Sequence, residues 1–363
     1  MPARVTRAAP PAPAAAHPST GTLTSIAASA GVSVSTVSKV LNGRTDVSPD
    51  TRERIGQLLR KHGYQPGPRL GFGVVDLLLG SGECLGTGGH SPWAEELIYG
   101  TVPAASEAGH SVVVTPVGSA AEFYQWLTQA TARGTHGALS VLHLPRGAEL
   151  KQLAAAGIPV VVIDPAQEPD AAVRSVGTTN WQSGLSAARH LIELGHARIA
   201  AITGPASLWS SRARLDGFRA AMLEAGLAVD ERLVRRDELM VVGGRTQAAV
   251  LLDQPDPPTA IVAGNDAQAF GVLQALTERG LRAPGDVSVV GFDDVPVASW
   301  SAPALTTVRQ PLAAMAATAF RMLRAADDAA PHAQHVELAT ALVVRDSTGP
   351  PPAGQSPRAA KEN

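Results

Sequence analysis

The pattern of hydrophobic and polar positions changes near residue 72. From there onward, short apolar runs alternate with amphipathic segments, which is typical of a parallel α/β sheet covered by helices. The apolar runs predict strands at residues 72–79, 111–117, 137–144, 160–163, 199–203, 260–263 and 287–291. The amphipathic segments predict helices at residues 93–108, 123–133, 184–194, 214–225, 267–279 and 313–326. The chain is therefore predicted to contain a large α/β body that follows a smaller unit.

The segment from residue 21 to residue 64 predicts this smaller unit, which has three short helices. The first helix spans residues 22–30 and is capped by Thr22, and its inward-facing residues are Ile26, Ala27 and Ala30. Gly31 follows and permits a tight turn, since glycine adopts a positive φ at little cost. A third helix begins at the Ser-Pro-Asp sequence of residues 48–50, and its core face contains Ile55, Leu58 and Leu59.

The second helix has two contrasting faces. Ser33 is a favourable N-cap for it, and it runs to about Asn42. At 100° per residue, its apolar face contains Val37, Val40 and Leu41. The opposite face contains Ser35, Ser38, Lys39 and Asn42. That face is small, polar and singly charged, as a helix that enters the major groove of DNA must be.

The charge distribution is uneven along the chain. Residues 1–70 hold nine Lys and Arg against three Asp and Glu, a net charge of +6, whereas the whole chain carries −2. The remaining residues therefore carry −8. A basic segment on an acidic body suits a polyanionic partner for that segment. A solvated basic tail would explain the charge equally well.

Composition excludes several classes of protein. No stretch approaches the roughly 18 apolar residues of a spanning helix, so we expect no membrane association. The single cysteine, Cys84, allows no internal disulfide and fits the reducing cytoplasm. Residues 1–20 and 348–363 are rich in Pro, Ala and Gly and predict disordered tails. Prolines also interrupt residues 1–20 where a signal peptide would need a continuous apolar run.

Residues 22–66 resemble a known DNA-binding headpiece. The stretches I-A-x-x-A-G-V-S-x-x-T-V-S, V-L-N-G and V-S-x-x-T-R match, position by position, the lactose-repressor (LacI/GalR) family of bacterial transcription regulators. The resemblance implies that residues 21–64 form a helix-turn-helix domain that binds double-stranded operator DNA.

The resemblance also implies a role for individual residues of this domain. It makes Val34, Ser35 and Lys39 the residues that contact base edges. It makes Ser33, Thr36, Asn42 and Thr51 candidates for phosphate contacts, which position the protein without specifying sequence. Ser38 shares the polar face of the second helix and is a further candidate DNA-binding residue.

Residues 65–71, a short hinge linker, depart from the family pattern. Family members usually carry a helix here that docks in the minor groove and wedges a leucine into the central base step. Pro66, Gly67 and Pro68 oppose such a helix, and the connector is also shorter than usual. Arg69 remains a candidate for a minor-groove or phosphate contact, whereas Leu70 is not expected to act as a wedge.

Four polar positions in the body draw attention because they follow predicted strands. Ligands of open α/β sheets collect at the carboxyl ends of the strands, where Asp164, Asn265 and Asp293 stand, and Arg214 is placed at the start of the next helix. Each residue by itself could merely cap a helix. Together they would be costly to bury unless something polar fills the space between them. Asp266 and Asp294 look more like caps or supporting groups.

The family resemblance extends over the body, including RHLIELGHARIAAITGP, PTAIVAGNDAQAFGVLQAL and LVVRDST. It implies a periplasmic-binding-protein-like effector-binding and dimerisation domain over residues 72–347, with parallel sheets in two lobes around a ligand cleft. We place the first lobe at about 72–174 and 310–332, and the second at about 175–309 and 333–347. Arg214, Asn265 and Asp293 match ligand-binding positions, Asp164 is a fourth candidate, and Trp93 and Gln310 match less securely. Trp181 and Trp209 could stack on a sugar or simply belong to the core.

These observations predict a sequence-specific repressor of carbohydrate-utilisation genes that responds to a small sugar-like effector. A regulator with a purine or a partner protein as effector is the alternative. No catalytic set, metal-ligand spacing or cofactor motif is evident, so we expect no enzyme, no metal and no cofactor. We expect a homodimer in the cytoplasm, associated with the nucleoid. A tetramer is not expected because the tail lacks the leucines of a coiled coil.

Overall fold

The chain forms two separate units. The structure is a computed structural model that describes residues 20–41, 47–61, 73–80, 91–143, 145–169, 173–325 and 335–353. The first unit contains residues 1–71 and the second contains residues 72–363. The predicted hinge at residues 65–71 lies outside the described residues, so the absence of a hinge helix stays a prediction. The predicted tails lie outside them too, except for Thr20 and residues 348–353.

The first unit is the predicted three-helix domain. Its helices are α1 (Thr20–Ala30), α2 (Val34–Leu41) and α3 (Pro49–Lys61). They enclose a small core of Ile26, Ala27, Ala30, Val37, Ile55 and Leu59. Ser33 and Ser48 cap α2 and α3 as expected, because their Oγ atoms accept hydrogen bonds from the backbone N–H groups of Thr36 and Thr51. The predicted cap of α1 is wrong, since that helix begins two residues before Thr22.

The second unit contains two six-stranded sheets. The first has the spatial order β2 (His110–Pro116), β1 (Gly73–Leu79), β3 (Gly137–Val141), β4 (Val160–Ile163), β5 (Arg174–Thr178) and β11 (His335–Leu338). The second has the order β7 (Val234–Arg236), β6 (Ile199–Thr203), β8 (Ala260–Ala263), β9 (Ser288–Asp293), β10 (Thr306–Arg309) and β12 (Ala341–Val343). All pairs are parallel except β10 with β12. Parallel sheets need cover on both faces, which explains the long apolar strands.

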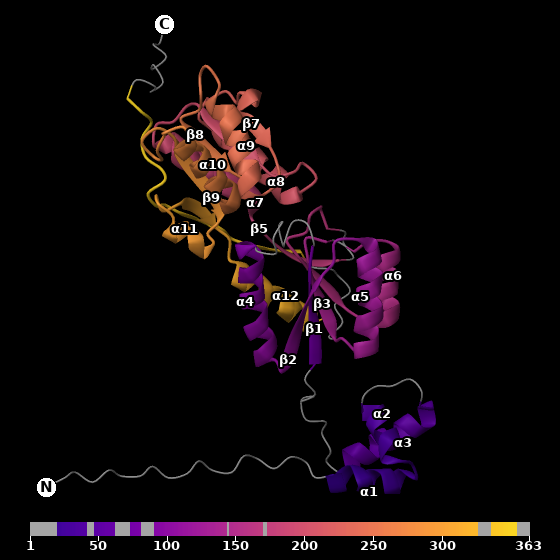
Figure 1. The fold of residues 1–363 in the computed structure, drawn as a ribbon. Coiled ribbons are helices and arrows are strands. Elements are labelled where there is room, and N and C mark those ends of the chain that lie inside the picture. The colour runs from indigo at the N-terminus through magenta and orange to yellow at the C-terminus, as the bar shows by residue number, and fades with distance from the viewer. Residues whose placement is uncertain are drawn as a thin grey trace, which may run out of the picture. The chain divides into compact units, whose positions relative to one another are not determined.

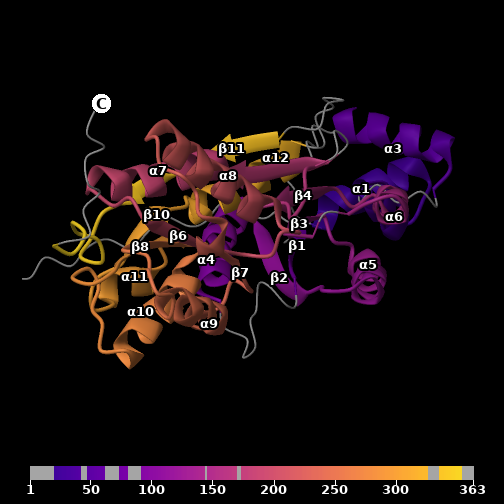
Figure 2. The same cartoon turned by 90° about the horizontal axis from the view of Figure 1, so that it is seen from above.

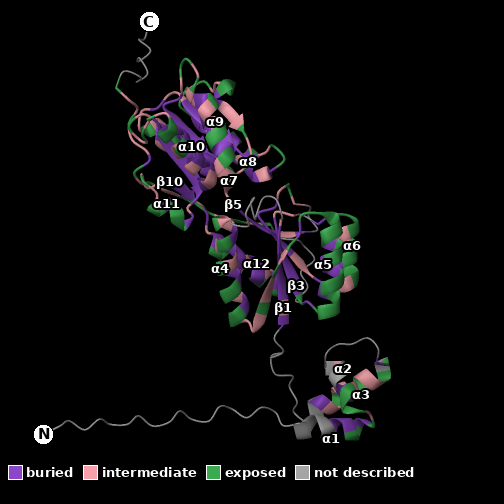
Figure 3. Cartoon of the chain, viewed as in Figure 1, coloured by how far each residue is buried: buried purple, intermediate pink, exposed green. Residues whose placement is uncertain are grey.

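Helices cover both faces of each sheet (Figures 1 and 2). In the first lobe α4 (Pro92–Glu107) and α12 (Leu312–Arg324) cover one face, and α5 (Ala120–Arg133) and α6 (Ala148–Ala156) cover the other. In the second lobe α7 (Asn180–Glu193) and α8 (Trp209–Glu224) lie opposite α9 (Val241–Leu252) and α10 (Asp266–Glu278). The short α11 (Pro296–Trp300) and the 3-10 turn η1 (Glu231–Leu233) complete this lobe. Figure 3 shows buried central strands and exposed outer helix faces.

The chain crosses between the lobes three times, and this changes the predicted lobe boundaries. The crossings follow β5, β10 and β11. β5 pairs with β4, and β11 pairs with β5, so both strands belong to the first lobe. The predicted boundaries at residues 174/175 and 332/333 are therefore wrong by a few residues. Pairing with a distant strand, which no local pattern contains, decides where these two segments belong.

Two glycines bring α7 and α8 into close contact. A Cβ atom at Gly184 would lie 1.9 Å from the carbonyl oxygen of Arg214, and one at Gly217 would lie 1.9 Å from that of Trp181. No side chain fits at either position. The two helices can therefore approach closely enough for α7 to contact the residues of α8 that face the cleft.

The end of the described chain is packed onto the second lobe, which corrects the predicted start of the C-terminal tail. The carbonyl oxygen of Gly349 accepts hydrogen bonds from Nε2 of the buried His196 and from Oγ of Ser288. Oγ1 of Thr348 lies 3.0 Å from Nε2 of His190. Residues 348 and 349 therefore belong to the folded domain, because they satisfy buried polar groups that would otherwise lack partners.

Candidate functional site

A cavity of about 400 Å³ lies between the two lobes of the second unit, near the carboxyl ends of their strands. Its walls include residues from the first lobe, such as Trp93, and from the second lobe, such as Asn265. All six residues proposed from the sequence line it: Trp93, Asp164, Arg214, Asn265, Asp293 and Gln310. The structure thus brings together side chains that are up to 217 positions apart in the sequence. Such a volume suits a small polar molecule.

Arg214 lies inside α8, because that helix begins at Trp209 and not at the predicted position 214. Its Nε donates a hydrogen bond of 2.8 Å to Oδ1 of Asn180, and its Nη1 donates one of 2.7 Å to the carbonyl oxygen of Gly264. The guanidinium also stacks 4.6 Å from the ring centroid of Phe292. Three contacts hold the group rigidly, and its Nη2 has no partner among the described residues, so binding to a ligand would need little further ordering.

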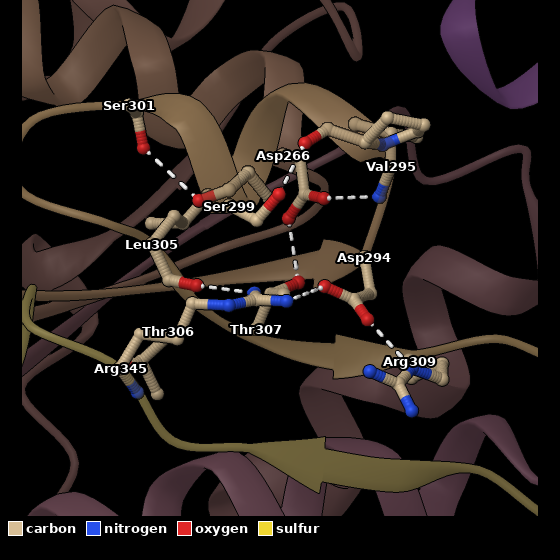
Figure 4. A network of polar contacts seen from close by, with 12 residues as sticks. Asp266, Asp294, Val295, Ser299, Ser301, Leu305, Thr306, Thr307, Arg309 and Arg345 are labelled. Atoms are coloured by element: carbon tan, nitrogen blue, oxygen red, sulfur yellow. Dashed lines mark hydrogen bonds and ion pairs between the residues drawn. The ribbon is translucent and has the colours of Figure 1, made fainter.

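The backbone turns sharply where β9 ends at the cavity. Asp293 has φ +109° and Asp294 has φ +58°, a region that side chains other than glycine adopt at a cost of about 1–3 kcal/mol. The Asp294 carboxylate accepts hydrogen bonds of 2.6 Å from Nε of Arg309 and from Nη2 of Arg345 (Figure 4). These two ion pairs hold the turn and leave only Asp293 aimed at the cavity.

Asp266 supports the same turn from the start of α10. Its Oδ2 accepts a 3.0 Å hydrogen bond from the backbone N–H of Val295, and its Oδ1 accepts one of 2.6 Å from Oγ1 of Thr307 (Figure 4). Both carboxylate oxygens therefore have protein partners, although Asp266 also lines the cavity. Asp266 and Asp294 have the supporting roles expected from the sequence.

Two amides complete the polar wall. Asn265 caps α10, because its Oδ1 accepts a 2.8 Å hydrogen bond from the backbone N–H of Gln268. Its Nδ2 donates to the carbonyl oxygen of Leu239. Gln310, at the second crossing between the lobes, donates from Nε2 to Oδ1 of Asp293 and accepts from Oγ1 of Thr178. Each amide retains one N–H and one acceptor lone pair that these hydrogen bonds do not use.

Burial changes the acidity of the carboxyl groups in the cavity. It raises the pKa of Asp164, although the nearby Arg214 opposes the change. It raises the pKa of Asp293 to about 7, and here Arg214 and the hydrogen bond from Gln310 oppose the change while Asp164 adds to it. Burial and the charge of Asp293 likewise raise the pKa of Asp266. The cavity therefore holds carboxyl groups that are poorly solvated when empty.

The candidate DNA-binding residues that the structure describes lie at or within α2, apart from Thr51, which lies on α3. Val34 is 42% exposed, and Ser33 and Ser35 are exposed as well. Thr36 and Thr51 are half-buried, and Oγ1 of Thr51 accepts a hydrogen bond from Oγ of Ser48. Ser38 and Lys39 belong to α2, but their side chains are outside the description. Asn42 and Arg69 lie outside the described residues.

Comparisons with known proteins match both units. Residues 22–67 match the model of bacterial regulatory proteins of the lacI family, and residues 188–348 match that of the periplasmic binding protein-like domain. The HTH-type transcriptional regulator DegA of Bacillus subtilis is 31% identical over 334 residues, which are 91% of this chain and 98% of DegA. This chain belongs to the lacI family of bacterial transcription regulators.

Solved structures of the lacI family agree with this fold. A complex of the transcriptional regulator CelR with cellobiose superposes with a TM-score of 0.68 at 32% identity, over 91% of this chain and 100% of CelR. The lac repressor dimer bound to operator and the anti-inducer ONPF superposes with a TM-score of 0.66 at 25% identity, over 90% of this chain and 98% of the repressor. The first unit of this family member is thus its DNA-binding domain.

Sequence reasoning missed the apolar part of the cavity wall in this lacI-family protein. Leu208, Met240, Phe270 and Val297 line it together with Trp93. Phe270 could have been anticipated, because it lies one helical turn after Asp266 on α10. The others stand on loops or short elements without a periodic signal. Trp181 and Trp209, for which stacking on a ligand stayed open, are not among the lining residues.

In the described part of the chain, no helix is long and apolar enough to cross a bilayer. Likewise, no group of three or more His, Cys, Asp or Glu side chains there is arranged to bind a metal ion.

The raised pKa of Asp293 predicts a pH-dependent loss of stability. Between pH 4 and pH 7, roughly, an unfolded chain ionises this carboxyl while the folded protein keeps it protonated. The contribution of Asp293 to the free energy of unfolding therefore falls as pH rises through this window and stays constant above it. Asp293→Asn removes the penalty and still accepts the hydrogen bond from Gln310. Urea unfolding at pH 5, 6, 7 and 8 measures the free energy of unfolding of both proteins. The value for the variant should rise relative to that of wild type up to about pH 7. A difference independent of pH contradicts this assignment.

Proposed function

We propose that this lacI-family regulator represses genes of carbohydrate utilisation and that a small sugar-like effector modulates its binding to operator DNA. The observation that carries the proposal is the convergence of Asp164, Arg214, Asn265 and Asp293 on one cavity. Carboxylates, an amide and a guanidinium together suit a ligand with many hydroxyl groups, which donate and accept hydrogen bonds alike. The CelR structure, which contains cellobiose, supports a saccharide.

We assign a role in ligand binding to each of the six residues. Asp164 and Asp293 accept hydrogen bonds from ligand hydroxyls, and Arg214 donates to ligand oxygens. Asn265 and Gln310 contribute further hydrogen bonds, while Trp93 offers an apolar surface to the less polar face of a sugar ring. The cleft binds its ligand without reaction, as fits relatives that are transcription regulators. No observation on this chain favours the alternative of a purine or a partner protein.

We further propose that operator DNA is bound through α2, with Val34, Ser35 and Lys39 contacting base edges. Ser33, Thr36, Ser38, Asn42, Thr51 and Arg69 then add contacts that position the protein on the backbone. The protein acts in the cytoplasm, where the operator DNA lies. The lac repressor structure, which contains operator, supports this role for the first unit.

The DNA-binding assignment predicts a specific defect. Lys39→Ala should weaken binding to the operator by about 1–3 kcal/mol and relax sequence preference, because a base contact is lost. Thr51→Ala should weaken binding to operator and random DNA alike, because a phosphate contact carries no sequence information. Titration of both variants against operator and scrambled duplexes separates the two effects. Unchanged discrimination in Lys39→Ala would mean that α2 is not the recognition helix.

We propose that the protein is a homodimer, because one small headpiece covers too little DNA for tight binding. Tyr99 on α4 is 68% exposed, and Val102 and Val114 on α4 and β2 are also exposed apolar residues. Sedimentation at micromolar concentration should show a dimer, and Tyr99→Asp should shift it toward monomer. Leu223→Asp is the control, since Leu223 on α8 is also an exposed apolar residue, at 79%. A wild-type monomer or tetramer contradicts the proposal.

The cavity assignment predicts a protein that binds DNA but no longer responds to its effector. Arg214→Ala should abolish the effect of the sugar on operator binding while affinity for DNA stays near that of wild type, because a fixed donor in the cleft is lost. Arg219→Ala is the control, since Arg219 lies on the same helix but pairs with Glu231 at the surface. The measurement is operator binding with increasing sugar. A variant that responds at the same sugar concentration as wild type would rule out the cleft.

A further inference from the structure

Several hydrogen-bonding atoms of the cavity lining have no partner among the described residues. The Asp164 carboxylate is only 6% exposed, and neither of its oxygens accepts a hydrogen bond from any described residue. Of the two Asp293 oxygens, only Oδ1 has a donor, the Gln310 amide. Among the described residues, nothing pairs with Nη2 of Arg214 either. With respect to the described residues, the cavity therefore presents three free carboxylate oxygens and one free guanidinium nitrogen.

These free atoms favour a ligand that donates more hydrogen bonds to the charged groups of the cavity than it accepts from them. Once Asp164 and Asp293 are ionised, their carboxylate oxygens only accept, so each of the three free oxygens then needs a donor from the ligand. Hydroxyl groups supply such donors and can also accept from Arg214. A phosphate ester supplies charged acceptor oxygens and would place them beside carboxylates. A buried acceptor without a donor disfavours binding, so the two ligand types should differ strongly.

The charges around the cavity also disfavour a phosphate ester as ligand. Within the described residues, the lining contains a single cationic side chain, Arg214, against the carboxyl groups of Asp164, Asp266 and Asp293. Residues 81–90, which precede the lining residue Ser91, contain no lysine or arginine in the sequence. Two of the donor nitrogens of Arg214 already bind Asn180 and Gly264. Little cationic capacity is left to neutralise a dianion in a cavity of low polarity.

We propose that the effector is an uncharged, unphosphorylated sugar, bound through hydroxyl groups to Asp164 and Asp293, and that the cleft excludes its phosphate esters. Asp164 is the residue that decides this selectivity, because both of its oxygens are free. The inference rests on the proposed sugar response and narrows its ligand class. The regulator would then sense a free sugar, before any kinase has acted on it.

The test is calorimetric titration of the full chain with matched pairs of ligands at pH 8, above the raised pKa of Asp293. Ribose, glucose and cellobiose are compared with ribose 5-phosphate, glucose 6-phosphate and cellobiose 6-phosphate. At least one free sugar should bind, and its phosphate ester should bind about 100-fold more weakly or worse, because like charges in a buried site repel. A phosphate ester that binds as well as its free sugar, or better, overturns the inference while leaving a sugar-responsive regulator intact. If no member of either series binds, the proposed function fails and the inference fails with it.

A pair of variants tests the residue assignment. Asp164→Asn removes the charge at nearly constant shape, so the ratio between free sugar and ester should fall to about tenfold or less. Asp216→Asn removes a carboxylate from the outer side of α8, where its side chain is 62% exposed, and should leave the ratio unchanged. Far-UV circular dichroism and urea unfolding confirm that both variants are folded. An undiminished ratio in folded Asp164→Asn overturns the role of Asp164.

Discussion

At the end of β9 the backbone passes through two consecutive residues with positive φ, and the cleft depends on the contacts that hold them there. Asp294 is fixed by Arg309 and Arg345, and the following residue, Val295, is fixed by the carboxylate of Asp266. Without these contacts the turn would relax toward ordinary extended or helical backbone. The Asp293 carboxylate would then leave the cavity. Asp266 and Asp294, which bind other groups of the protein, thus determine the position of Asp293, the carboxylate that faces the ligand.

The same contacts tie the cleft to the segments that join the lobes. Arg309 ends β10, immediately before the second crossing, and Arg345 follows the third crossing and β12. Gln310 lies on the second crossing itself and donates to Asp293. Asp293, which would hold a ligand, is therefore adjacent in sequence to Asp294, whose ion pairs anchor two of the crossings. In proteins built from two lobes, such crossings are where the backbone changes when the lobes move.

Particular residues show how far sequence reasoning reached. The caps Ser33 and Ser48, the core residues Ile26, Val37 and Ile55, and the long buried strands were all predicted, because caps and periodicity are local signals. The short strands β5, β10, β11 and β12 were not predicted. Their sequences, such as TTVR and HVEL, are brief and partly polar, and they become strands only by pairing with a neighbour from elsewhere in the chain.

By itself, the sequence determined the family, the two-unit organisation and six of the residues that line the cavity, because these features stand in recognisable motifs or directly after apolar strands. Only the tertiary structure decided which lobe contains β5 and β11, that Arg214 lies inside its helix and not at the start, and which carboxylates have no protein partner among the described residues. Asp164, Asp266, Asp293 and Asp294 all follow strands and are alike in sequence. They differ in the groups that surround them, such as Thr307, Arg309 and Arg345, which come from segments tens of residues away. Whether a carboxylate is bound by its own protein or left for a ligand is a matter of three-dimensional neighbours, and no local pattern records them.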